Sequence, residues 1–133
     1  MGHAELIELS LEIAAERAGD LVPLVYPRFF TLYPEAVLEF GDDQDDHSKG
    51  KMLVNLLMEI IGQAENKVYP NNIRRWISDH FAYGVVPSMY TDLFTCLLGV
   101  VKESNGSDWS DDMAAAWQAQ FDGLMVYVDE AYV

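Results

Sequence analysis

The chain has 133 residues, half of them apolar, and a formal net charge of −14 from 22 acidic and 8 basic residues. This composition predicts one globular domain with a real core, and it argues against nucleic acid or an anionic membrane surface as partners, since both need cationic side chains. No apolar run reaches the ~20 residues of a spanning helix, and the N-terminus lacks a basic, signal-like start, so we expect a cytoplasmic protein. A single cysteine, Cys96, excludes a disulfide framework and a cysteine metal site.

Apolar residues recur at helical spacing along the chain, so the elements that we expect are all helices. They are expected up to about residue 19, over 21–30, over 48–61, around His80, over 87–103 and over 113–128, with a short turn at 34–40, a polar loop at 41–47, a linker at 66–72 and a turn at 105–108. Pro27 predicts a kink in the second helix, because proline removes a backbone hydrogen bond. Gly84 and Pro87 predict the end of one helix and the start of the next.

His80 is the residue whose surroundings point most clearly to chemistry. It shares one helical stripe with Ile73, Trp76 and Ile77, and it stands just before the corner at Gly84. An imidazole at the end of an apolar helix face can offer a nitrogen to a metal inside a pocket that excludes water. The alternative is a half-buried helix-end histidine that hydrogen-bonds to a backbone carbonyl.

Three segments, in this order and spacing, carry a resemblance to a known family. Residues 26–35 read Tyr-Pro-Arg-Phe-Phe-Thr-Leu-Tyr-Pro-Glu, and Phe40 stands 14 residues after Tyr26. Residues 49–57 read Lys-Gly-Lys-Met-Leu-Val-Asn-Leu-Leu, and His80 is followed ten residues later by Tyr90, at the end of a Tyr-Gly-Val-Val-Pro-Ser-Met-Tyr run. From about residue 5 to 132 the chain resembles a globin, closest to the single-domain bacterial haemoglobins and the globin domain of flavohaemoglobins.

The resemblance implies an all-α globin fold, a helical sandwich around a haem pocket, as one globin domain over residues 1–133. It implies haem b as the cofactor, with His80 as the proximal iron ligand. Phe40 would pack on the porphyrin, Leu53 would lie over the iron, and Tyr26 would donate a hydrogen bond to bound oxygen. Lys49 stands where globins usually carry His or Gln, and it would reach a propionate or solvent, or ligate the iron if it lost its proton. The proximal and inner walls would be lined by Val85, Leu93 and Leu124.

Two features of the charge pattern bear on this site. Half of the eight basic residues fall in the two segments that would flank the pocket and could meet the haem propionates, the alternative being ordinary helix-surface charge: Lys49, Lys51, Arg74 and Arg75. Late in the last helix, where flavohaemoglobin-like domains place a glutamate, an ungapped count lands on Tyr132, with Glu130 two residues away. In the family that glutamate is the proximal carboxylate that makes the iron electron-rich, and this chain departs from the pattern at that position.

The function that the resemblance implies is reversible binding of oxygen or another diatomic ligand, such as NO or CO, for storage, transport or sensing. An alternative is a nitric oxide dioxygenase, which would need a separate reductase because 133 residues hold no flavin or nicotinamide domain. A third is a globin-fold signalling module without haem, which Lys49 keeps open. The sequence leaves room for a homodimer.

Overall fold

The computed structural model describes residues 1–40, 47–67 and 69–132, apart from the side chains of residues 39 and 40. Within these ranges the regular elements are all helices, which confirms the all-α fold. The elements are α1 (His3–Ala18), α2 (Val22–Leu32), η1 (Pro34–Phe40), α3 (His47–Ala64), α4 (Pro70–Ala82), α5 (Pro87–Asn105), η3 (Gly106–Asp108) and α6 (Asp111–Ala131). Most of the expected polar loop, residues 41–46, lies outside the described residues.

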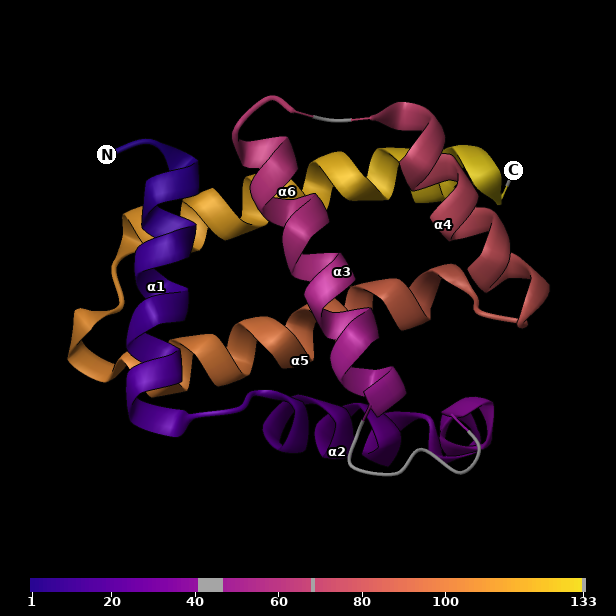
Figure 1. Cartoon of the computed structure of the whole chain (residues 1–133), viewed down its shortest axis with the longest axis horizontal. Coiled ribbons are helices and arrows are strands. Elements are labelled where there is room, and N and C mark those ends of the chain that lie inside the picture. The colour runs from indigo at the N-terminus through magenta and orange to yellow at the C-terminus, as the bar shows by residue number, and fades with distance from the viewer. Residues whose placement is uncertain (41–46, 68, 133) are drawn as a thin grey trace.

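The helices form two crossing layers (Figure 1). α1 and α3 run across the long helices α5 and α6, with α1 packed on both of them and α3 packed on α6 and α2. α4 packs on the C-terminal part of α6, and α2 packs on α5 at the opposite edge. No described helix is by itself long and apolar enough to cross a membrane, and α4 and α5 pass that test only as a pair, with a bend of 111° between them.

The core lies between these layers and is centred on α5 and α6. Phe94 of α5 stacks on Phe121 of α6, with 4.6 Å between the ring centroids. Trp117 is fully buried, and its indole N–H donates to the Ser10 hydroxyl of α1 over 3.0 Å, so the polar atom of this large side chain is paired. Leu124 belongs to the same core, with 1% of its surface exposed. The core therefore joins α1, α5 and α6, and the other helices pack around them.

Three proline and glycine positions shape the parts that surround the site. Pro27 lies inside α2 and does not end it, and Tyr26 just before it stays buried, with 1% of its surface exposed. After α4, Gly84 adopts a φ of +82°, a left-handed conformation that glycine takes without a steric penalty. Pro87 then begins α5, as expected. This corner turns the chain sharply just after His80.

Candidate functional site

A cavity of about 560 Å³ lies between α3, α4 and α5 and is closed in part by α2 and η1. Its volume falls in the ~300–1,000 Å³ range of small-molecule and cofactor sites. The wall is largely apolar and includes Phe29, Ala36, Met52, Leu56, Trp76, Val85, Met89, Leu93 and Phe94. The polar groups at its edge come from Glu35, Ser48, Lys51, Asn55, Asp79 and His80. An apolar cavity with a few polar groups at its edge suits a large, mostly apolar ligand that carries a charged margin.

His80 stands in the last turn of α4 and lines this cavity. Its Nδ1 lies 2.7 Å from the carbonyl oxygen of Trp76, so Nδ1 carries the hydrogen and donates it. Nε2 is then the nitrogen with the free lone pair, and an imidazole held in this way is the arrangement that metal-binding histidines use. The two interpretations offered by the sequence are therefore compatible, because the bond to a carbonyl prepares the same ring to bind a metal.

Aromatic side chains surround the His80 ring. The ring centroids of Trp76 and Tyr90 lie 4.8 and 6.1 Å from that of His80. Tyr90 also contacts Tyr132, with 3.3 Å between the two hydroxyl oxygens, and Tyr132 donates its own hydrogen to the Val85 carbonyl. Burial is the main reason why the pKa of Tyr90 lies well above its ordinary value, and the hydrogen bond with Tyr132 raises it further. The surroundings of His80 on this side are therefore neutral rings.

One buried polar atom in this wall lacks a partner. Trp76 Nε1 is shielded from solvent, and no acceptor for its hydrogen exists among the residues that the structure describes. Buried N–H groups are nearly always paired in native proteins, and an exception needs an explanation. An acceptor brought by a bound ligand would supply one, since Trp76 lines the cavity.

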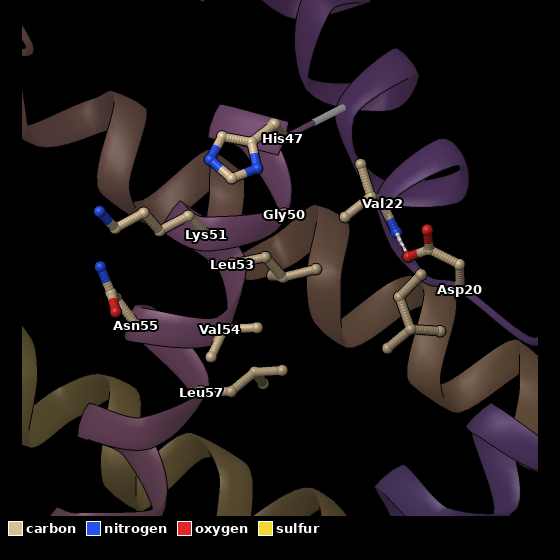
Figure 2. A pocket seen from close by; sticks show the side chains of 10 residues that line it. Asp20, Val22, His47, Gly50, Lys51, Leu53, Val54, Asn55 and Leu57 are labelled. Atoms are coloured by element: carbon tan, nitrogen blue, oxygen red, sulfur yellow. Dashed lines mark hydrogen bonds between the residues drawn. The ribbon is translucent and has the colours of Figure 1, made fainter. Parts of the chain in front are cut away.

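The face of α3 toward the cavity differs from the expected one by one residue. Ser48, Lys51, Met52, Asn55 and Leu56 line the cavity as a single helical stripe. Leu53 is 4% exposed and lines a second cavity instead, of about 580 Å³, between α3 and the start of α2. Figure 2 shows Leu53 and Leu57 directed toward Val22, while Lys51 and Asn55 leave α3 on the other side.

A shift of one residue turns a helical side chain by about 100°, which is enough to move it from one cavity to the other. In the structure, Met52 and Leu56 line this cavity and Leu53 does not, and the position of Leu53 over an iron stays a prediction of the resemblance. The physical reason is that Leu53 faces the apolar start of α2, because Leu21 and Val22 line the same second cavity.

The other expected residues divide into two groups. The structure brings His80, Val85 and Leu93 together in the wall of the 560 Å³ cavity. It does not bring in four others. Tyr26 donates its phenol hydrogen to the backbone carbonyl of Lys49 over 3.1 Å, and neither residue lines the cavity; nor do Leu53 and Leu124. Phe40 ends η1, and its side chain lies outside the described part of the structure.

Of the four basic residues expected near the propionates, Lys51 is the one that lines the cavity. Arg74 turns toward α6, where it pairs with Glu130 at 3.5 Å and lies 5.7 Å from the centre of the Tyr127 ring. Neither Arg75 nor Lys49 belongs to the cavity wall. Sequence reasoning placed Trp76 on the stripe of His80 without assigning it to the wall, and it missed Asn55 and Ser48, although the stripe of α3 residues that contains these two could be read from their spacing.

Comparison with known proteins identifies the fold family. The sequence model of the globin family matches residues 24–127, which include α3, α4, α5 and most of α6. The chain belongs to the globin family. Membership of this family implies haem binding, which agrees with one imidazole held ready in a largely apolar cavity.

Two relatives illustrate the similarity. Leghemoglobin-1 of Vicia faba is 33% identical over 54 residues, which are 41% of this chain and 38% of that protein. An anaerobic nitrite reductase of Gossypium hirsutum is 33% identical over 61 residues, which are 46% of this chain and 37% of that protein. The chain thus spans less than two fifths of the length of these plant relatives.

Proposed function

We propose that this globin holds haem b through His80 Nε2 and reversibly binds a diatomic gas, oxygen first and NO or CO as well, on the α3 side of the haem. The observation that carries the proposal is the hydrogen bond from His80 Nδ1 to the Trp76 carbonyl, which leaves Nε2 as the ligating nitrogen at the wall of a 560 Å³ cavity. Haem, when bound, supplies the iron on which the gas binds.

The residues of the cavity fit this cofactor in three respects. Val85 and Leu93 form an apolar wall on the His80 side, and Met52 and Leu56 form one on the α3 side, so both faces of a bound haem would meet apolar side chains. Lys51 stands at the edge, where a propionate would meet a cation. The unpaired N–H of Trp76 offers a donor to the carboxylate or ring of the cofactor. Phe40 stays our predicted contact with the porphyrin.

On the gas side, we assign the polar contact to Asn55 and give Tyr26 and Lys49 a supporting part. Asn55 lies on the α3 stripe that lines the cavity, and its amide can donate a hydrogen bond. The phenol of Tyr26 already donates to the Lys49 carbonyl, so it ties α2 to the first turn of α3. Leu53 and Leu124 are buried in the core and do not line the cavity.

Within the family, we propose that the chain is similar to the single-domain bacterial haemoglobins. The support is Tyr90, which follows His80 by ten residues and lies 6.1 Å from it in the structure. The rings that contact His80 are neutral, and Tyr132 stands where a carboxylate was expected, which favours reversible binding over nitric oxide dioxygenation with a separate reductase. We still predict a cytoplasmic location and allow for a separate reductase and a homodimer.

A cycle of binding and release tests this function. The haem-loaded ferrous protein is exposed to oxygen, then deoxygenated, and its absorption spectrum is recorded over several cycles. We expect the spectrum to return each time. Rapid conversion to ferric protein in the first cycle would contradict reversible binding. The alternative function is tested by measuring nitric oxide consumption with NADH, with and without cell extract. Sustained turnover that depends on the extract would show a dioxygenase with a separate reductase.

A further inference from the structure

We propose that the second cavity, which lies between α3 and the start of α2, binds a compact aromatic carboxylate, and that this ligand weakens the hold on the haem. The cavity has a volume of about 580 Å³. It is distinct from the cavity that His80 lines, but the two share Lys51 and Asn55. The binding of the carboxylate stands on this cavity alone, whereas its effect on the haem rests on the function proposed above.

Apolar side chains form most of the wall of this second cavity. They come from the start of α2 and from α3, and they are Leu21, Val22, Leu53, Val54 and Leu57. Val54 is 55% exposed although it lies in this wall, so a ligand that covers it removes apolar surface from water. Gly50 leaves further room, because a Cβ added to it would meet nothing within 4 Å. An apolar body is therefore the first requirement of the ligand.

Basic side chains mark one end of the cavity. His47 and Lys51 stand four residues apart at the start of α3, so they lie on the same side of this helix. The one acidic side chain among the described wall residues is Asp20, and its carboxylate already accepts the backbone N–H of Val22 over 3.0 Å. Figure 2 shows Asp20 and Lys51 on opposite sides of the cavity. A single carboxylate beside Lys51 would therefore meet a cation and stay clear of Asp20.

The length of the wall limits the ligand to a compact molecule. From Lys51 to Leu57 the wall extends about 9 Å along α3, because a helix rises about 1.5 Å per residue. A carboxylate on two fused rings fits beside a wall of this length, whereas an extended long-chain fatty acid does not. The volume of the cavity also lies in the ~300–1,000 Å³ range of small-molecule sites. An aromatic acid of this size meets both requirements.

Lys51 connects this cavity to the haem site. Its side chain lines both cavities, and in the function proposed above it meets a haem propionate. One ammonium group does not pair fully with two carboxylates at once, so the aromatic acid and the propionate compete for it. The loss of an exposed ion pair of this kind corresponds to about a threefold change in affinity. Because coupling between two sites is reciprocal, haem should weaken the binding of the acid by the same factor.

The binding is tested on the haem-free protein, with naphthoate as the probe and naphthylmethanol as its uncharged counterpart. The backbone amide signals in NMR spectra locate each probe. We expect the largest shifts at Val22, Gly50 and Val54, and an affinity for the alcohol that is about threefold lower. Shifts centred on Trp76 and Leu93 would place the probe in the other cavity, and equal affinities would show that the carboxylate is not recognised. Either result would overturn the site.

Two pairs of variants test the same site. Lys51→Gln should lower the affinity for naphthoate to that for the alcohol, whereas Lys102→Gln, exposed on α5 and outside both cavities, should leave it unchanged. Gly50→Phe should fill the cavity and abolish binding, whereas Val126→Phe, at a position on α6 that is 65% exposed, should not. Binding to Gly50→Phe with the affinity of the unchanged chain would contradict the assignment.

The effect on haem is measured as the transfer of haem from the loaded protein to an excess of apomyoglobin. Saturating naphthoate should speed this transfer about threefold in the unchanged chain and should not change it in Gly50→Phe. An unchanged transfer rate with naphthoate bound would overturn the competition for Lys51. A chain that takes up no haem would refute the proposed function together with this competition, while the binding of naphthoate to the haem-free protein still decides the site itself.

Discussion

Replacing Tyr26 by phenylalanine separates two roles for its hydroxyl group, a hydrogen bond within the protein and a hydrogen bond to bound oxygen. The phenol is 1% exposed and donates to the Lys49 carbonyl over 3.1 Å. Removing it loses one neutral hydrogen bond, worth about 0.5–1.5 kcal/mol, and leaves the carbonyl with one partner fewer. We therefore expect the free energy of unfolding of the haem-free protein to fall by about 1 kcal/mol, which for a domain of this size lowers Tm by roughly 4 °C.

The same variant should leave oxygen release nearly unchanged. Tyr26 does not line the cavity, and its hydrogen is already given to Lys49, so we expect the off-rate to stay within about twofold. Urea unfolding gives the stability, and stopped-flow release of oxygen gives the rate. Tyr127→Phe is the control, because the described residues give its hydroxyl no hydrogen-bond partner. A rise of tenfold or more, which equals about 1.4 kcal/mol, would show that the phenol leaves Lys49 for the bound gas and would refute the reasoning.

Three further substitutions test the cavity wall and the fold around it. Asn55→Ala should raise the oxygen off-rate about fivefold, as expected for one lost neutral hydrogen bond, whereas Asn72→Ala, outside the cavity, should not. Burial raises the pKa of the Glu59 carboxyl, so the folded state holds this proton more tightly than the unfolded state, and stability should fall as pH rises through that pKa. Glu59→Gln should reduce this fall, measured by urea unfolding between about pH 4 and 7. Gly84→Ala, at a φ of +82°, should lower stability by about 1–2 kcal/mol, whereas Gly50→Ala inside α3, where an added Cβ meets nothing within 4 Å, should raise it by about 0.5–1 kcal/mol in thermal unfolding. No change at Gly84 would contradict the corner geometry.

The fold could be predicted from the sequence because its signals are local. The apolar spacing identifies the helices, and Gly84 and Pro87 mark the corner after His80 with the conformations that the structure shows. The structure brings His80, Val85 and Leu93, three residues that the resemblance singled out, together in one cavity wall. These residues follow one another around a single corner, so their relation depends on little else in the chain.

The α3 side of the cavity could not be predicted in the same way. α3 is apolar over a wide arc, because Met52, Leu53, Leu56 and Leu57 alternate between two faces, and spacing alone does not tell which face meets which neighbour. The bond from Tyr26 goes to a backbone carbonyl 23 residues away, which no pattern of side chains reveals.

The contact between Tyr90 and Tyr132 could not be predicted from the sequence either. Counting along the last helix leads to Tyr132. It does not show that the Tyr132 hydroxyl contacts Tyr90 and the Val85 carbonyl, because these contacts depend on how the end of α6 packs on the corner after α4.

We propose that His80 holds the haem iron, and its replacement by glycine tests this most directly. The absorption spectrum of ferrous protein is recorded after haem addition for the unchanged chain, for His80→Gly, and for His47→Gly, a histidine at the start of α3 outside this cavity. We expect His80→Gly alone to lose the normal ferrous spectrum and to regain it when imidazole is added. A normal spectrum in His80→Gly without imidazole would contradict the account.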